Sequence, residues 1–221
     1  MLAKARSETS GRSEPRPGIR RVRAAATRAA LIAAARERFA KAGYHATGTT
    51  DLVALAGVTR GALYHHFTDK EHLFEAVFRQ VADELSTAAG EAVAALADDP
   101  WRQLLEGLQA YLRLVATNPE AQRLLLLDGP AVFGWTRWRD LQSEYTFGHL
   151  VNMLRRLMDQ GLIQARAPEP LSHLMLAALN DAAMTIAHAP DPQAARMEAG
   201  DALSALVGGL RLEPWDRSSR R

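Results

Sequence analysis

The chain of 221 residues is long enough for one ordinary domain or two small ones. It contains no Cys, which excludes disulfides and thiolate metal sites, and no apolar run long enough for a membrane span, so we expect a cytoplasmic protein without membrane contact. Its 41 Ala and 30 Leu against 10 Val and 4 Ile favour helices over strands, so we expect an all-α fold.

Charge is distributed unevenly along the chain. Residues 1–80 hold 14 Lys and Arg against 7 Asp and Glu, whereas residues 81–221 hold 13 against 18. A basic first third on an acidic remainder suggests a protein that binds nucleic acid with one end. A basic tail is the alternative, because 7 of the 14 cations precede residue 24. We interpret residues 1–23, rich in Ser, Arg and Glu, as a disordered basic arm.

Helical periodicity defines the elements of the first third. Apolar residues spaced three and four apart predict a helix over about 24–42, which ends at Gly43. A short helix opens at Thr50 and ends at Gly57, and a second runs over 60–66 with Thr59 as its cap. A longer helix opens at 68–71 and carries an apolar stripe of Leu73, Phe74, Val77, Phe78, Val81 and Leu85.

Prolines divide the rest of the chain, because proline breaks helix interiors but suits their first turns. After a Pro-free stretch, Pro100 is the first of eight prolines that separate apolar segments. We expect helices near 101–117, 119–128, 134–160, 169–189 and 192–211.

The two short helices and the turn between them form the most informative motif. Gly57 can adopt the left-handed conformation that a tight helix-to-helix turn needs. The second helix then presents a polar, small and aromatic surface that suits base edges and phosphates: Thr59, Arg60, Gly61, Tyr64 and His65. The alternative is a helical hairpin with an incidental glycine.

The run from Thr49 to Phe67, followed by Lys70-Glu71-His72-Leu73, resembles the DNA-binding domain of the TetR family of bacterial regulators. Ala34 to Phe39, Gly43-Tyr44 and Thr47 upstream also match, so the resemblance covers roughly residues 25–80. It implies a three-helix, helix-turn-helix DNA-binding head over 24–82. It also implies an α-helical ligand-binding and dimerisation body over 83–213.

The resemblance further implies a role for each matching residue. Thr50 and Lys70 are expected to bind phosphates, and Arg60 to read a base, with guanine as its natural target. Tyr64 and His65 are expected to reach a phosphate or a thymine methyl group. The expected DNA-binding residues are Thr50, Thr59, Arg60, Gly61, Tyr64, His65 and Lys70.

The family body detects a small molecule, and the middle of this chain supplies residues for a mostly apolar pocket with a few polar groups. The expected effector-binding residues are Tyr111, Phe133, Trp138, Tyr145, His149, Asn180 and Met184. They predict an apolar or aromatic effector. Ordinary core packing is the alternative, since aromatic and Met residues at helical spacing usually form the core.

The last two expected helices, 169–189 and 192–211, hold more apolar and small residues than one buried face needs. Two such helices from each subunit predict a four-helix homodimer interface, although the surplus can also cover the body's own core. The sequence therefore predicts a regulator, most readily a repressor, that an effector releases from an inverted-repeat operator in double-stranded DNA. An activator with the same head is the alternative.

Enzymatic motifs are absent from the sequence. It has no Walker A loop, G-x-G-x-x-G, H-E-x-x-H or G-x-S-x-G, and its seven His residues show no metal-ligand spacing. We therefore expect no catalytic residues, no metal and no cofactor. A helical enzyme of unknown chemistry and a helical protein whose head binds another protein remain rival interpretations.

Overall fold

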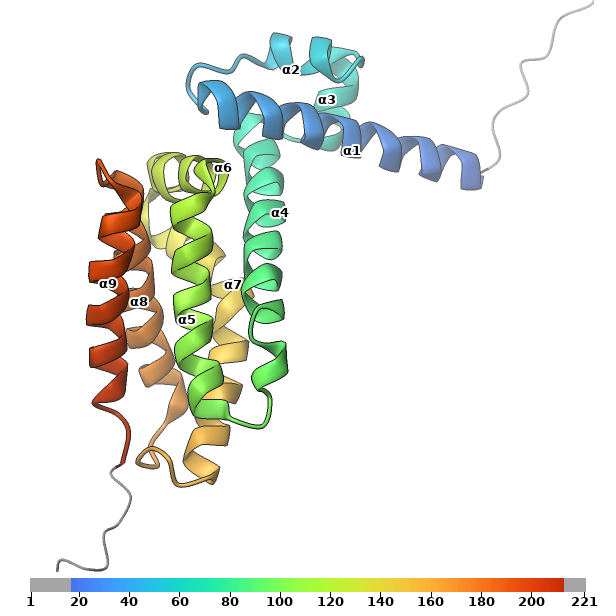
Figure 1. The fold of residues 1–221 in the computed structure, drawn as a ribbon. Coiled ribbons are helices and arrows are strands. Elements are labelled where there is room, and N and C mark those ends of the chain that lie inside the picture. The colour runs from blue at the N-terminus through green and yellow to red at the C-terminus, as the bar shows by residue number, and fades with distance from the viewer. Residues whose placement is uncertain (1–16, 213–221) are drawn as a thin grey trace, which may run out of the picture.

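The computed structural model describes residues 17–212, and the regular elements in this range are all helices (Figure 1). An isolated antiparallel bridge joins Ile163 to Arg211. The all-α prediction is confirmed. The elements are α1 (Pro17–Ala42), α2 (Thr49–Leu55), α3 (Arg60–His66), α4 (Lys70–Glu91), η1 (Ala94–Leu96), α5 (Pro100–Thr117), α6 (Pro119–Ala121), η2 (Gln122–Asp128), α7 (Gly129–Asp159), α8 (Pro168–His188) and α9 (Pro192–Gly208).

The head consists of α1, α2, α3 and the first part of α4. Helix α1 lies across the head and buries Leu31 and Phe39 completely, which fulfils its predicted apolar stripe. The two short helices each contribute one fully buried leucine, Leu52 from α2 and Leu63 from α3. Because each short helix buries so little, most of its other residues are exposed.

Helix α4 connects the head to the body without interruption. Its N-cap is Asp69, whose side chain accepts a hydrogen bond from the His72 amide at 2.7 Å. The predicted stripe is confirmed, since each of its residues from Leu73 to Leu85 is at most 5% exposed. The boundary predicted after residue 82 therefore falls inside a continuous helix, and α4 belongs to both halves of the molecule (Figure 1).

The body is a bundle in which α5, α7, α8 and α9 pack together with the lower part of α4 (Figure 1). Its core is largely aliphatic, with Trp138 as the largest fully buried side chain. Among the described residues, no helix is both long and apolar enough to cross a membrane.

The first helix begins earlier than predicted. Helix α1 starts at Pro17, so residues 17–23 are helical and the expectation of disorder for this part of the arm is wrong. Proline is favoured in the first turn of a helix, and the Arg and Ala residues that follow it are strong helix formers. The remainder of the predicted arm, residues 1–16, lies outside the described residues.

The segment predicted as one helix over 119–128 is also different. It consists of the short α6 and the π-helical η2, and α7 begins directly after it at Gly129. Pro130 occupies the first turn of α7, where proline does not interrupt a helix. The real break is at Gly134, whose φ of 72° is left-handed, and the helix predicted from residue 134 resumes after it.

Candidate DNA-binding head and effector cavities

The turn between α2 and α3 has the predicted geometry. Gly57 adopts a φ of +65°, and its amide donates to the Ala54 carbonyl at 3.2 Å. The Val58 amide donates to the Val53 carbonyl at 3.0 Å. Only glycine adopts this left-handed conformation without strain, so Gly57 fixes the direction in which α3 leaves the turn.

Thr59 starts α3 as its N-cap, as predicted. Its hydroxyl accepts a hydrogen bond from the Ala62 amide at 3.2 Å, which satisfies one of the free amides of the first turn. Leu63 and Phe67 on the inner face are 1% exposed. The inner face therefore anchors α3 to α1, and the opposite face is exposed in the described part of the chain.

The exposed face of α3 displays the residues that the sequence selected. Thr59, Arg60, Gly61, Tyr64 and His65 are all exposed, and Tyr64 retains 47% of its surface. The Arg60 guanidinium carbon lies 5.8 Å from the centre of the Tyr64 ring. The face thus combines a cation, hydroxyl groups and aromatic rings on one short helix.

Gly61 has no evident structural purpose in the fold. A Cβ atom at this position meets only the Thr59 hydroxyl, at 3.9 Å, and the backbone does not have a positive φ. Glycine in a helix costs about 1 kcal/mol relative to alanine. The open space over Gly61 leaves room for an external group to approach the backbone of α3 closely.

Thr50 and Lys70 flank this face in different ways. Thr50 is exposed in the first turn of α2, whose N-cap Gly48 supplies no side-chain hydrogen bond. The Lys70 ammonium instead donates to the carbonyls of Tyr44 at 3.0 Å and Thr47 at 3.2 Å. It also lies 4.0 Å from the centre of the Tyr44 ring. Lys70 therefore ties α4 to the loop before α2, a role that the sequence did not suggest.

The body contains two adjoining hollows. An inner cavity of about 20 Å³ lies between α4, α5, η2, α7 and α8. An outer cleft of about 690 Å³ opens between α4, α5 and α7. The two share the wall residues Ser86, Tyr111, Tyr145, Thr146 and Leu179.

Comparison with known proteins identifies both halves of the chain. Residues 31–77 match "Bacterial regulatory proteins, tetR family", and residues 101–210 match "Tetracyclin repressor-like, C-terminal domain". The crystal structure of a TetR-family transcriptional regulator from Pectobacterium atrosepticum is 35% identical, with a TM-score of 0.76, over 88% of this chain and 98% of that chain. The chain belongs to the TetR family. This is a family of DNA-binding transcriptional regulators.

The TetR-type relatives include a protein named as a repressor and one named as an activator of transcription. The probable acrEF/envCD operon repressor of Escherichia coli is 37% identical over 99 residues, which are 45% of either chain. The HTH-type transcriptional activator FasR of Mycolicibacterium smegmatis is 32% identical over 98 residues, 44% of either chain. The chain thus spans less than half the length of these relatives.

Four of the seven expected effector residues line the hollows of the TetR body. Tyr111 and Tyr145 border both, His149 borders the outer cleft, and Asn180 borders the inner cavity. Burial raises the pKa of Tyr111 to about 12, so its hydroxyl stays protonated at neutral pH. Sequence reasoning missed Gln142 of α7, which lines the inner cavity and is 8% exposed.

The other three expected residues do not line either hollow. Trp138 is fully buried and its indole N–H donates to the Leu125 carbonyl at 2.6 Å, so it belongs to the core. Phe133 packs between Phe74 and Phe78 of α4, with ring centres 5.4 and 5.5 Å apart. Met184 is a partly buried residue that packs against the core from α8.

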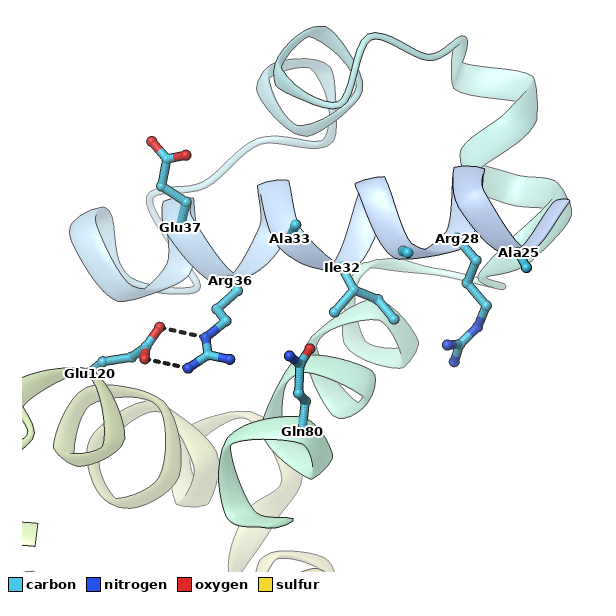
Figure 2. Close-up of a pocket in the computed structure, with 9 residues that line it drawn as sticks. Ala25, Arg28, Ile32, Ala33, Arg36, Glu37, Gln80 and Glu120 are labelled. Carbon is cyan, nitrogen blue, oxygen red and sulfur yellow. Dashed lines mark hydrogen bonds and ion pairs between the residues drawn. The ribbon is translucent and has the colours of Figure 1, made fainter. Parts of the chain in front are cut away.

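The TetR head is attached to the body through α1. Arg36 of α1 donates to Glu120 of α6 at 2.7 and 2.8 Å, as Figure 2 shows, and to Glu84 of α4 at 2.7 and 2.8 Å. Hydrogen bonds to Glu120 and Glu84 raise the pKa of the Arg36 guanidinium, so it stays charged. A groove of about 720 Å³ runs beside this contact, between α1 and Gln80 of α4 (Figure 2).

A second attachment comes from the π-helical η2. The Asp128 carboxylate accepts a hydrogen bond from the Tyr44 amide at 2.9 Å and lies 3.5 Å from Arg123. Three residues earlier in η2, Leu125 borders the inner cavity. One short segment of the body therefore touches both the cavity and the head.

Proposed function

We propose that this chain is a transcriptional repressor that binds an inverted-repeat operator as a homodimer and is released by an apolar or aromatic small molecule. The observation that carries the proposal is the exposed face of α3, where none of the described residues covers Arg60, Tyr64 or His65. The protein acts on double-stranded DNA in the cytoplasm and catalyses no reaction. Activation of transcription is the alternative, supported by the relative named as an activator.

In this proposal α3 enters the major groove and the flanking residues bind the backbone. Thr59, Arg60 and Gly61 lead the helix, and Arg60 donates to a guanine. Tyr64 and His65 contact a phosphate or a thymine methyl group. Thr50 binds a phosphate at the first turn of α2. Lys70 retains one N–H bond beyond its two carbonyl partners, and this donor serves a phosphate.

The dimer forms through α8 and α9. Leu174 of α8 is 70% exposed and Leu206 of α9 is 64% exposed. Near them α9 exposes small residues, Ala202, Ala205 and Gly208, which allow a close approach of a second helix. A two-fold axis across this surface pairs each leucine with the same surface of a second copy.

Release requires that the effector binds the non-binding conformation better than the DNA-binding one. The inner cavity and the outer cleft are both walled by α4, whose other end carries Lys70 in the head. A ligand that displaces α4 or η2 therefore shifts the head relative to its partner. For a tenfold loss of DNA affinity, the effector's binding free energies for the two conformations have to differ by about 1.4 kcal/mol.

Selection of bound genomic DNA fragments by the full-length protein tests the proposal. We expect an inverted repeat whose half-sites lie about 10 bp or somewhat more apart, centre to centre. The selected operator then serves in an anisotropy titration with candidate effectors. Enrichment of single half-sites bound by a monomer, or no sequence preference at all, contradicts the proposal.

A further inference from the structure

The inner cavity has a polar but uncharged wall. Its lining combines aliphatic residues with hydroxyl and amide side chains, and no Asp, Glu, Lys, Arg or His from residues 17–212 borders it. The polar lining residues are Ser86, Tyr111, Gln142, Ser143, Tyr145, Thr146 and Asn180. An ionised group that enters this cavity therefore loses its hydration without meeting an opposite charge, which is strongly unfavourable. The wall selects against carboxylates, phosphates and ammonium groups.

Two amides in this wall are available to a ligand. Gln142 and Asn180 are each 8% exposed. The buried Gln142 Nε2 atom makes no hydrogen bond of regular geometry among the described residues, and its nearest polar neighbour is the Tyr111 hydroxyl, whose pKa the Gln142 side chain lowers against the larger effect of burial. Asn180 likewise makes no side-chain hydrogen bond within the part of the chain that the structure describes. A buried N–H without a partner destabilises the folded protein, so an arriving oxygen atom that accepts from Gln142 gains binding free energy.

The size of the cavity limits what can enter. Its volume of about 20 Å³ is close to the space that a single water molecule needs. One oxygen atom of a hydroxyl or a carbonyl therefore fits between Gln142, Asn180 and Tyr111. The rest of the ligand has to lie in the outer cleft, whose 690 Å³ falls within the range of small-molecule sites.

The outer cleft has apolar walls and an acidic rim. Leu104, Leu108 and Met153 supply apolar surface, whereas Asp83 and Glu91 stand exposed at the edge without an ion pair in the described structure. Among the described residues, Arg156 is the one Lys or Arg that lines the cleft. This distribution of charge repels anions, in agreement with the uncharged inner wall.

We propose that the effector is an uncharged or cationic molecule that inserts one neutral hydroxyl or carbonyl oxygen into the inner cavity, where Gln142 donates to it. Asn180 and Tyr111 complete this oxygen-binding subsite, and the apolar part of the ligand fills the outer cleft. Acids such as fatty or aromatic carboxylates are excluded as effectors. The inference rests on the proposed function, because it defines the chemistry of the ligand at that function's effector site.

Three probes with the same ring system test the subsite: 2-naphthol, naphthalene and 2-naphthoate. Equilibrium dialysis against the full-length protein at neutral pH, without DNA, gives each dissociation constant. We expect 2-naphthol to bind about tenfold more tightly than naphthalene, and 2-naphthoate to bind no better than naphthalene. Gln142→Leu should remove the preference for 2-naphthol and leave naphthalene unchanged. It should fold, because it replaces an unpaired buried polar group with an apolar one.

Gln103→Leu is the matched control, since Gln103 borders only the outer cleft. It should keep the preference for 2-naphthol. Equal or tighter binding of 2-naphthoate, no measurable binding of 2-naphthol, or an unchanged preference in Gln142→Leu overturns the inference. These outcomes do not involve DNA. Failure of the proposed function shows itself separately, as the lack of a selected operator, and leaves the probe preferences intact.

Discussion

The exposed leucines of α8 and α9 allow the loss of dimer stability in a variant to be worked out. Complete burial of a leucine side chain stabilises a structure by about 1.5–3 kcal/mol. Leu174 is 70% exposed in the single chain, and a symmetric dimer buries two copies of it. Leu174→Ala should therefore weaken the dimer by about 2–4 kcal/mol, which raises its dissociation constant by about 30-fold to 1,000-fold.

Sedimentation velocity over a range of protein concentrations measures this constant directly. Leu206→Ala, which removes a side chain that is 64% exposed on the neighbouring helix, should have a similar effect. Leu55→Ala is the matched control, because Leu55 is 48% exposed but lies on α2 in the head (Figure 1). It should leave the association of subunits unchanged.

If Leu174→Ala and Leu206→Ala both keep the dissociation constant of the unmodified protein, the subunits do not associate through this surface. The outcome also bears on DNA binding, since a weakened dimer presents fewer paired α3 helices. Both variants should lose operator affinity at low protein concentration and recover it at high concentration, whereas a folding defect persists at all concentrations.

Three further predictions concern the head and its attachment to the body. Arg60→Ala should cost roughly 1–3 kcal/mol on the selected operator and relax its specificity, measured by anisotropy on cognate and scrambled DNA; equal losses on both contradict base reading. Lys70→Met should lower the melting temperature, because it removes the bonds to Tyr44 and Thr47, and should weaken cognate and scrambled DNA alike with a salt slope lower by about one unit. The hydrogen bond from Arg36 holds the pKa of the Glu84 carboxyl below its ordinary value of 4.5. The contribution of Glu84 to the free energy of unfolding is therefore fully present above pH 4.5, and it is lost as the pH falls through the lowered pKa. The free energies of unfolding of the unmodified protein and of Glu84→Gln, measured at several pH values, should differ at neutral pH and become equal in acid. A difference that stays constant with pH shows that the ion pair of Arg36 and Glu84 does not cause it.

The fold of the head could be predicted closely because its signals are local. Gly57 and Thr59 define the turn and the cap by their own backbone chemistry, and α3 has the predicted bounds of 60–66. The signal for the start of α1 is weaker. Its first residues are charged and can be read as a tail, whereas the proline in the first turn and the helix-forming Arg and Ala residues after it favour the helix that the structure contains.

In the body, the sequence pattern did not predict which aromatic residues of α7 line a hollow and which belong to the core. Trp138, Tyr145 and Phe133 all lie on α7, yet Trp138 is in the core, Tyr145 borders both hollows and Phe133 packs against α4. Aromatic character does not distinguish these positions, because each ring is buried against a different neighbour. Gly134 adds a left-handed break that changes the register between Phe133 and the rest of the helix.

Gln142 nevertheless left a signal in the sequence. It stands one turn after Trp138 and three residues before Tyr145, so it occupies an inward position of α7. Asn180 stands in the same way between Leu176 and Ala183 on α8. A neutral amide at a core position has to find a partner, and the Gln142 Nε2 atom makes no hydrogen bond of regular geometry in the described structure. Two such amides on facing helices therefore point to a ligand site more specifically than the aromatic residues around them, because an aromatic ring is fully satisfied by the core and an unpaired amide is not.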